Sequence, residues 1–139
     1  MTPKRFNPET DLAPMPFDER ICRRAMEMKN YGLKWRPQVG CFVWDPDEFI
    51  KPASPFPGRI YFVLSLARFI EIFDTIEQMT RKLVWLPTWH QARLVCRQLG
   101  ITDEVFEKQR QRCPSLQPVE EILGIYELIV ETLKIENTT

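Results

Sequence analysis

Three segments of this chain place a tryptophan close to a proline at the end of an apolar run, and they hold all four tryptophans. The segments are Trp35-Arg36-Pro37, Val43-Trp44-Asp45-Pro46 and Val84-Trp85-Leu86-Pro87-Thr88-Trp89. An indole is a large apolar body with one N–H donor, so it suits the margin of a core or a contact surface. Proline ends a strand or occupies the first turn of a helix. The three segments therefore predict rigid junctions between strands and helices.

The pattern of apolar residues predicts an α+β domain. Short runs of β-forming residues predict about three strands, and apolar residues at helical spacing predict about five helices. The first two strands should form an antiparallel hairpin around the proline-rich loop 46–58. We expect an extended proline-rich arm over residues 1–17, and a single α+β domain over 18–139 in which helices cover a small, mostly antiparallel sheet. The expected strands are 41–44, 60–64 and 83–86; the expected helices are 18–30, 66–81, 88–99, one beginning at Thr102 and one beginning near Pro118.

Local side-chain signals mark the helix ends. Asp18 is a good N-cap for the first helix, and Gly32 follows near its C-terminal end. Thr88-Trp89-His90-Gln91 matches a capping box, in which the threonine hydroxyl and the glutamine side chain satisfy backbone N–H groups reciprocally. These signals place helix starts independently of the apolar pattern.

The cysteines and the single histidine do not form a recognisable chemical site. Cys22, Cys41, Cys96 and Cys113 stand alone, without a C-x-x-C pair, and His90 is the only histidine. A zinc site would need ligands from distant segments, so small core residues in a reducing compartment are the expected role of the cysteines. His90 falls in the first turn of a helix, with no nucleophile motif near it. We therefore expect no metal, no cofactor and no catalytic residue.

Nothing in the sequence predicts export or membrane insertion. The first residues are not followed by the apolar stretch of a secretory signal. The most apolar run, 60–73, contains Arg68 and Glu71, and it is too short and too charged to span a bilayer. We expect a cytoplasmic protein without a membrane segment.

An acidic cluster, Asp45, Asp47 and Glu48, admits two interpretations. Carboxylates are ligands of hard cations, so a magnesium site is conceivable. The alternative is a single helical turn with Asp45 as N-cap, Pro46 at its first position and Glu48 at its third. We prefer the helical turn, because no further ligand motif accompanies the cluster.

Residues 88–112 resemble a helix-turn-helix. Leu99-Gly100-Ile101-Thr102 has the pattern of the turn, and basic residues lie on both sides of it. The chain balances 19 basic against 19 acidic residues, with a small positive excess before residue 116, which supports a nucleic-acid partner only weakly. Asp103 and Glu104 would open the reading helix and repel phosphate, so a plain helical hairpin explains the pattern as well. The candidate nucleic-acid-binding residues are Arg93, Arg97, Lys108, Arg110 and Arg112.

The last helix is apolar nearly all round. Its main stripe runs from Val119 to Leu133, and Ile125 and Leu128 form a second stripe roughly opposite. Such a helix is either buried in its own domain or shared with a partner. The second stripe therefore predicts a possible homodimer through the C-terminal helix.

The segment Lys34-Trp35-x-Pro37-x-Val39-Gly40-x-x-Val43, with Val84-Trp85-Leu86-Pro87 and Gln91-Ala92 further on, resembles a pattern in small uncharacterised bacterial and phage-derived proteins. The resemblance extends over residues 35–100. It implies a bacterial or prophage origin and brings no activity or site residue with it.

The function that the sequence favours is a non-enzymatic protein-interaction or assembly module, with a protein or a second copy as partner. A DNA-binding regulator that uses residues 88–112 is the first alternative, and an unrecognised hydrolase is the second. The interaction surface is expected to combine the aromatic residues of the tryptophan segments with the second stripe of the last helix: Trp35, Trp44, Phe56, Trp85, Trp89, Ile125 and Leu128.

Overall fold

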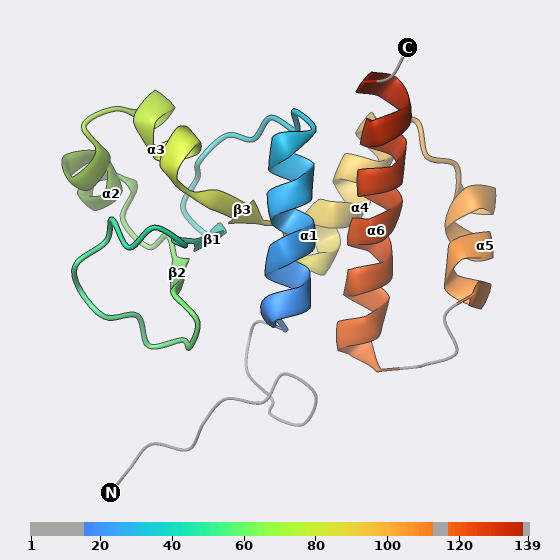
Figure 1. Cartoon of the computed structure of the whole chain (residues 1–139), viewed down its shortest axis with the longest axis horizontal. Helices are drawn as coiled ribbons and strands as arrows, with labels where there is room; N and C mark the ends of the chain where they lie inside the picture. Colours follow the sequence, from blue (N-terminus) through green and yellow to red (C-terminus); the bar gives the residue numbers. More distant parts are fainter. Residues whose placement is uncertain (1–15, 113–116, 138–139) are drawn as a thin grey trace, which may run out of the picture.

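The computed structural model describes residues 16–112 and 117–137, and within them the chain forms an α+β fold of six helices and three strands. Figure 1 shows α2 and α3 on one side of the sheet, α1, α4 and α6 on the other, and α5 against the outside of α6. The elements are α1 (Glu19–Asn30), β1 (Phe42–Trp44), β2 (Ile60–Phe62), α2 (Leu66–Phe73), α3 (Ile76–Lys82), β3 (Val84–Leu86), α4 (Trp89–Gln98), α5 (Asp103–Arg112) and α6 (Pro118–Asn137).

The three strands form one antiparallel sheet in the order β2-β1-β3. Val43 in the central strand lies opposite Tyr61 of β2 and Trp85 of β3, which fixes the register on both sides. The predicted hairpin of the first two strands and its long connecting loop are confirmed. The third strand adds to the free side of β1, so β2 and β3 are the two edges of the sheet.

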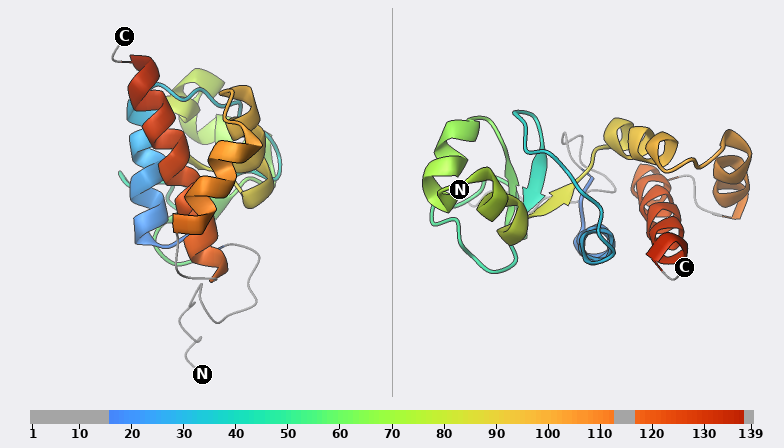
Figure 2. Two further views of the ribbon diagram at one scale, coloured as in Figure 1. Left: turned by 90° about the vertical axis from the view of Figure 1, so that its right-hand side faces the viewer. Right: turned by 90° about the horizontal axis from the view of Figure 1, so that it is seen from above.

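The alternation of side chains along the strands divides the core into two clusters, one on each face of the sheet. Phe42, Ile60 and Val84 point to the face that packs on α1, α4 and α6. Val43, Tyr61 and Val63 point to the other face, where Phe69 and Phe73 of α2 and Met79 of α3 cover them. The second view in Figure 2 shows the two groups of helices separated by the sheet.

The predicted helix 66–81 is wrong as one element, because the chain breaks after Phe73. Asp74 adopts a left-handed conformation with φ 75°, and Thr75 then caps α3 by accepting the N–H of Gln78. The apolar spacing runs through the break and concealed it. The signal was present, since Thr75-Ile76-Glu77-Gln78 has the capping-box pattern of a new helix start.

The predicted helix caps are confirmed. The Asp18 carboxylate accepts the N–H of Ile21 at 3.0 Å. Thr88 and Gln91 exchange the two hydrogen bonds of the capping box at the start of α4. Each cap satisfies backbone donors that a helix start leaves without intrahelical partners.

The apolar surface of α6 is explained by three neighbouring helices, α1, α4 and α5. Glu120 and Glu127 mark the side that faces α1, where they pair with arginines of that helix. Ile125 lies about 160° round the helix from Glu127, away from the side that faces α1, and Figure 1 shows α5 against the outside of α6. It is only 3% exposed, and Leu128 is half-buried. The prediction that these two residues form an exposed second stripe is therefore wrong for Ile125.

None of the helices in the described part of the chain is long and apolar enough to cross a membrane. Phe17, which we assigned to the end of the N-terminal arm, is buried against Phe42, with ring centroids 5.3 Å apart. The rest of the predicted arm, up to residue 15, lies outside the described residues.

Candidate interaction surface at the edge of the sheet

The backbone hydrogen bonds show which groups of the two edge strands point away from the sheet. Along β2, the Asp45 N–H donates to the Arg59 carbonyl at 3.0 Å and the Val63 N–H donates to the Cys41 carbonyl at 2.8 Å. Odd-numbered residues of this strand therefore direct their N–H and C=O toward β1, and even-numbered residues direct them outward. By the same alternation, the even-numbered residues of β3 face β1 and its odd-numbered residues face outward.

The outer edge of β3 is protected. α1 packs along this strand, and its residues Ala25 and Met28 line a small cavity together with Trp85. The outward carbonyl of Leu83 accepts the Lys29 ammonium at 3.2 Å. Pro87, at the next outward position after Trp85, has no N–H, and its carbonyl accepts the hydroxyl of Tyr126. A further strand cannot approach this edge without displacing α1.

The outer edge of β2 is open beyond its first residue. The outward carbonyl of Ile60 accepts the Ser54 hydroxyl, so the proline-rich loop reaches this end of the strand. Within the described residues, the outward N–H and C=O of Phe62 meet no hydrogen-bond partner. The Phe62 side chain is 39% exposed, and Leu64, two residues on and on the same face, is 76% exposed.

Val39 extends this exposed apolar group across to the neighbouring segment. It is 62% exposed, and the next residue, Gly40, donates its N–H to the Val63 carbonyl at 2.8 Å. Val39 therefore lies beside the end of β2. We call the outward backbone of Phe62, with the side chains of Phe62 and Leu64, the open edge.

An aromatic cluster centred on Phe42 packs against Phe62 of the open edge. The Phe42 ring contacts the rings of Phe17, Phe56 and Phe62, with centroids 5.3, 5.9 and 5.0 Å apart. Tilted and edge-on pairs of this kind add to the stabilisation that burial provides. The contact with Phe42 restrains the Phe62 ring, although the residue is 39% exposed.

A buried carboxylate fixes the loop that precedes β2. Asp45 is fully buried, and its carboxylate accepts the N–H groups of Phe49 and Ile50 at 3.0 and 2.8 Å and the Arg59 guanidinium at 2.6 Å. The predicted helical turn is wrong, because Glu48 has φ 59° and the chain makes a loop instead. Asp45 does act as a cap for backbone N–H groups, but across a longer turn.

The same contacts bear on the magnesium hypothesis. The Asp45 oxygens already accept three donors, and Asp47 and Glu48 are exposed side chains of the loop. Among the described residues, no group of three or more acidic, histidine or cysteine side chains is arranged to hold a metal ion. The geometry supports a structural role for Asp45.

The structure does not bring the predicted aromatic residues together into one surface. Trp35 and Trp85 stack on each other with ring centroids 6.1 Å apart and planes at 5°, beside α1. Trp44 and Phe56 are half-buried against the core cluster that packs on α1, α4 and α6, and Trp89 is 52% exposed at the start of α4. Most of these rings therefore contribute to packing, as junctions between elements.

The candidate nucleic-acid-binding residues lie on α4 and α5, and most are already paired with acidic groups. The Arg93 guanidinium lies over the Phe106 ring at 3.7 Å and 3.8 Å from the Asp103 carboxylate. Lys108 pairs with Glu104 and Arg110 pairs with Glu107, each at 3.7 Å. Arg97 and Arg112 are exposed. The pairing leaves little net positive charge on this face, although α4 and α5 do form a helix–turn–helix around Gly100, which has φ 77°.

The described cysteines are buried free thiols of the core. Burial, with the nearby charges of Asp18 and Glu19, raises the pKa of the Cys22 thiol to about 12. Burial also raises the pKa of Cys96. A thiol with a raised pKa is a poor nucleophile at neutral pH, because the thiolate is the reactive form. His90 is exposed on the first turn of α4, and Cys113 lies outside the described residues.

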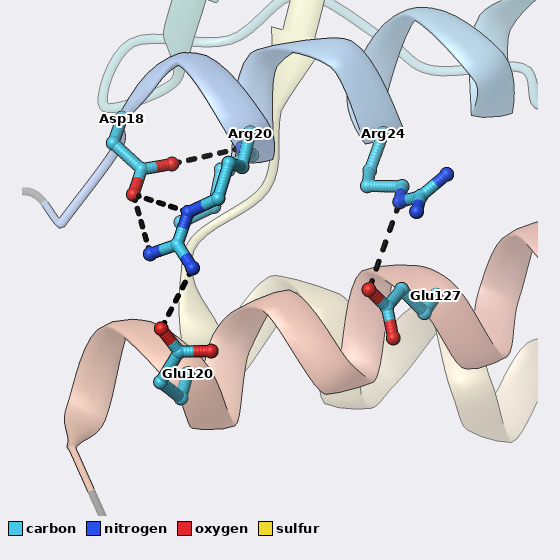
Figure 3. Close-up of polar contacts among 6 residues, drawn as sticks. Asp18, Arg20, Arg24, Glu120 and Glu127 are labelled. Atoms are coloured by element: carbon cyan, nitrogen blue, oxygen red, sulfur yellow. Dashed lines mark hydrogen bonds and ion pairs between the residues drawn. The ribbon is translucent and has the colours of Figure 1, made fainter. Parts of the chain in front are cut away.

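Charged pairs hold α1 against α6. Figure 3 shows Arg20 between Asp18 and Glu120, with Arg24 further along α1 opposite Glu127. Arg20 lies 2.9 Å from the Asp18 carboxylate and 2.7 Å from that of Glu120, and Arg24 lies 3.7 Å from Glu127. Each of these acids has a basic partner in place, so we interpret the row as a structural contact between the two helices.

Comparison of this chain with protein-family models, with curated proteins and with solved structures finds no match. The resemblance of residues 35–100 to bacterial and phage-derived proteins stays a prediction. The functional interpretation therefore rests on the geometry of the chain itself.

Sequence reasoning did not select Val39, Phe62 or Leu64 as candidate site residues. Phe62 and Leu64 alternate with the buried Tyr61 and Val63, as residues of any half-buried strand do. One signal was present: residues 60–66, Ile-Tyr-Phe-Val-Leu-Ser-Leu, contain no charged side chain. Edge strands usually carry charges or prolines that discourage pairing, so an uncharged run marks an edge strand as exceptional once the strand order is known.

Proposed function

We propose that this protein is a non-enzymatic protein-interaction module that acts in the cytoplasm and binds a β-strand along its open edge. The proposal is carried by one observation, the unpaired outward N–H and C=O of Phe62 beside the 76% exposed side chain of Leu64. In strand addition, main-chain hydrogen bonds supply affinity and alternate side chains supply specificity. Phe62 and Leu64 are the side chains that a bound strand would contact.

Two further features support this use of the edge. Exposed apolar patches on otherwise polar surfaces commonly mark sites of protein contact. The aromatic cluster around Phe42 and the Asp45 anchor of the preceding loop hold β2 rigidly, so little conformational entropy is lost when a strand binds. A rigid, uncharged strand with unpaired backbone groups is suited to pairing.

A photoreactive amino acid placed at Leu64 tests the proposal in cells. We expect irradiation to produce defined covalent products between this protein and a bound polypeptide, because the side chain at this position lies against the added strand. The matched control places the same group at Leu94, an exposed leucine on α4, a helix that packs on α6. Equal product patterns at both positions, or no product at either, would overturn the proposal.

The DNA-binding alternative has one observation in its favour, the helix–turn–helix of α4 and α5 with Thr102 accepting the Val105 N–H. If it is correct, binding to duplex DNA weakens as salt rises and weakens further in Arg110→Ala and Arg112→Ala. Binding that is absent at low salt, or that is insensitive to both substitutions, removes this alternative. The hydrolase alternative has no arrangement of described residues to support it.

A further inference from the structure

The strand that binds the open edge is, we infer, β2 of a second copy of this chain, related to the first by a twofold axis. This inference rests on the proposed function and names its partner. The result is a dimer in which two three-stranded sheets join into one continuous antiparallel sheet. Three features of the edge lead to this partner: its register, its charge and the state of the opposite edge.

The register permits reciprocal pairing. A twofold axis between antiparallel strands passes between two identical residues, and where these form a hydrogen-bonded pair each directs both its N–H and its C=O toward the other strand. Phe62 meets this condition, because its neighbours Tyr61 and Val63 use their groups toward β1. The N–H of Phe62 in each copy then donates to the Phe62 carbonyl of the other. Ser54 at the Ile60 carbonyl keeps the backbone ladder short, so apolar contact supplies much of the affinity.

The side chains along the edge are complementary to themselves. In this register Phe62 of one copy lies opposite Phe62 of the other, and Leu64 lies opposite Ile60, so apolar side chains meet apolar side chains along the pairing. Residues 60–66 carry no charge. The nearest cation, Arg59, is bound to Asp45 and falls opposite Ser65 of the other copy in this register. Like charges therefore do not oppose each other, as they would where a charged edge strand meets its own copy.

The protected edge of β3 explains why such pairing stops at two copies. After β2 pairs with its copy, the edges that remain in the sheet of the described residues are the two β3 strands. Both are occupied by α1, with Lys29 on the Leu83 carbonyl and Pro87 at the next outward position after Trp85. A chain whose sheet has one open and one protected edge forms a closed dimer and cannot extend into a fibre.

Sedimentation velocity on the full chain tests this inference. We expect a concentration-dependent dimer between about 5 and about 500 µM, the range in which weak dimers dissociate. Leu64→Glu should shift the dissociation constant at least tenfold toward monomer, because it places a carboxylate in the apolar contact. Leu94→Glu is the matched control and should leave the dimer intact. A wild-type chain that stays monomeric throughout overturns the inference, as does a dimer that Leu64→Glu does not weaken.

A cross-link gives a readout that is independent of stability. In a Cys113→Ser background, Phe62→Cys should form a disulfide-linked dimer on mild oxidation. Hydrogen-bonded antiparallel partners have Cα atoms about 5.5 Å apart, within the range of a disulfide. Leu94→Cys in the same background is the control and should form none. Equal cross-linking by the two variants would contradict the register.

The two proposals fail in different ways. If the wild-type chain is monomeric but the photoreactive group at Leu64 captures another polypeptide strand, the edge is a docking site and the second copy is the wrong partner. If neither self-association nor capture occurs, both proposals fall. Amide exchange separates the cases further: in a dimer, protection of the Phe62 N–H rises with protein concentration, whereas in a monomer it stays low.

Discussion

The two edges of the small sheet differ: neighbouring elements cover the outer edge of β3, whereas the outer edge of β2 is open beyond its first residue. β3 is bordered by α1, its Leu83 carbonyl is bound by Lys29, and its chain leaves the sheet through Pro87, whose carbonyl is bound by Tyr126. Among the described residues, β2 has one contact of this kind, from Ser54 to the Ile60 carbonyl, and Phe62 and Leu64 are exposed beyond it. This contrast between the two edges is the basis of the proposal that the open edge binds a strand.

The difference also separates the roles of the aromatic residues. Trp35 and Trp85 are stacked beside the protected edge, where they help to hold α1 and β3 together. Phe56 and Phe62 surround Phe42 next to the open edge, and Phe62 keeps a large part of its ring exposed. The number of aromatic residues in a segment therefore did not mark the proposed contact surface. The orientation of the backbone at the strand edge was needed as well.

The largest expected effect comes from the loop beside the open edge. Asp45→Asn replaces a fully buried carboxylate that accepts two N–H groups and the Arg59 guanidinium, and the new amide must direct its own N–H at one of these donors. We expect the free energy of unfolding to fall by about 2–4 kcal/mol, reduced from a fully buried pair because Arg59 is partly exposed. Urea unfolding followed by tryptophan fluorescence measures it.

Asp47→Asn is the matched control for this substitution, since Asp47 is exposed in the same loop. Its free energy of unfolding should stay within about 0.5 kcal/mol of the wild type. A loss of the same size in both variants would show that Asp45 acts through general charge and not through the bonds that position the loop.

An intermediate effect is expected at the protected edge. Tyr126 is fully buried, and its hydroxyl donates to the Pro87 carbonyl at the end of β3. Tyr126→Phe leaves that carbonyl without its donor, which should cost about 1–3 kcal/mol. Tyr61→Phe removes a comparable bond to the Pro52 carbonyl in the partly exposed loop and should cost less, because water can replace the hydroxyl there. Equal losses of unfolding free energy in Tyr126→Phe and Tyr61→Phe would show that the hydrogen bond at the β3 edge contributes no more to stability than the one in the loop.

The sequence predicted those features of the fold that depend on neighbouring residues. The hairpin, the capping box at Thr88 and Gln91 and the cap at Asp18 follow from short-range signals, and all are confirmed. The break at Asp74 was missed because apolar periodicity continues across it, although Thr75 and Gln78 signalled a new start. In this segment the apolar spacing predicted one continuous helix, whereas the cap pattern at Thr75 predicted a new helix start, and the cap pattern was correct.

The features that could not be predicted depend on the placement of distant elements. The burial of Ile125 requires α5 to pack on a particular side of α6, which no local pattern specifies. The open edge depends on β3 joining β1 on the side away from β2. Until that order is known, Phe62 and Leu64 read as ordinary strand residues. Strand order and helix docking are set by the whole core, and a single sequence does not reveal them.

The smallest expected effect concerns Lys29, which lies between α1 and the outward carbonyl of Leu83. Lys29→Met keeps an unbranched apolar stem and loses the hydrogen bonds of the ammonium, so the free energy of unfolding should fall by about 1 kcal/mol at neutral pH. Lys34→Met, at an exposed position after α1, is the control and should have no measurable effect.

The deficit of Lys29→Met should also depend on pH. Burial lowers the pKa of Lys29 below its ordinary value of 10.5. Between the lowered pKa and 10.5 the unfolded chain binds more protons than the folded chain, so this residue makes the wild type more stable as the pH rises. The methionine variant lacks that gain, and the difference between the two proteins should widen from pH 7 toward pH 10. All other groups titrate alike in both proteins. If the difference in unfolding free energy between wild type and Lys29→Met instead narrows over this range, the charged ammonium, and not the neutral amine, stabilises the contact with the β3 edge.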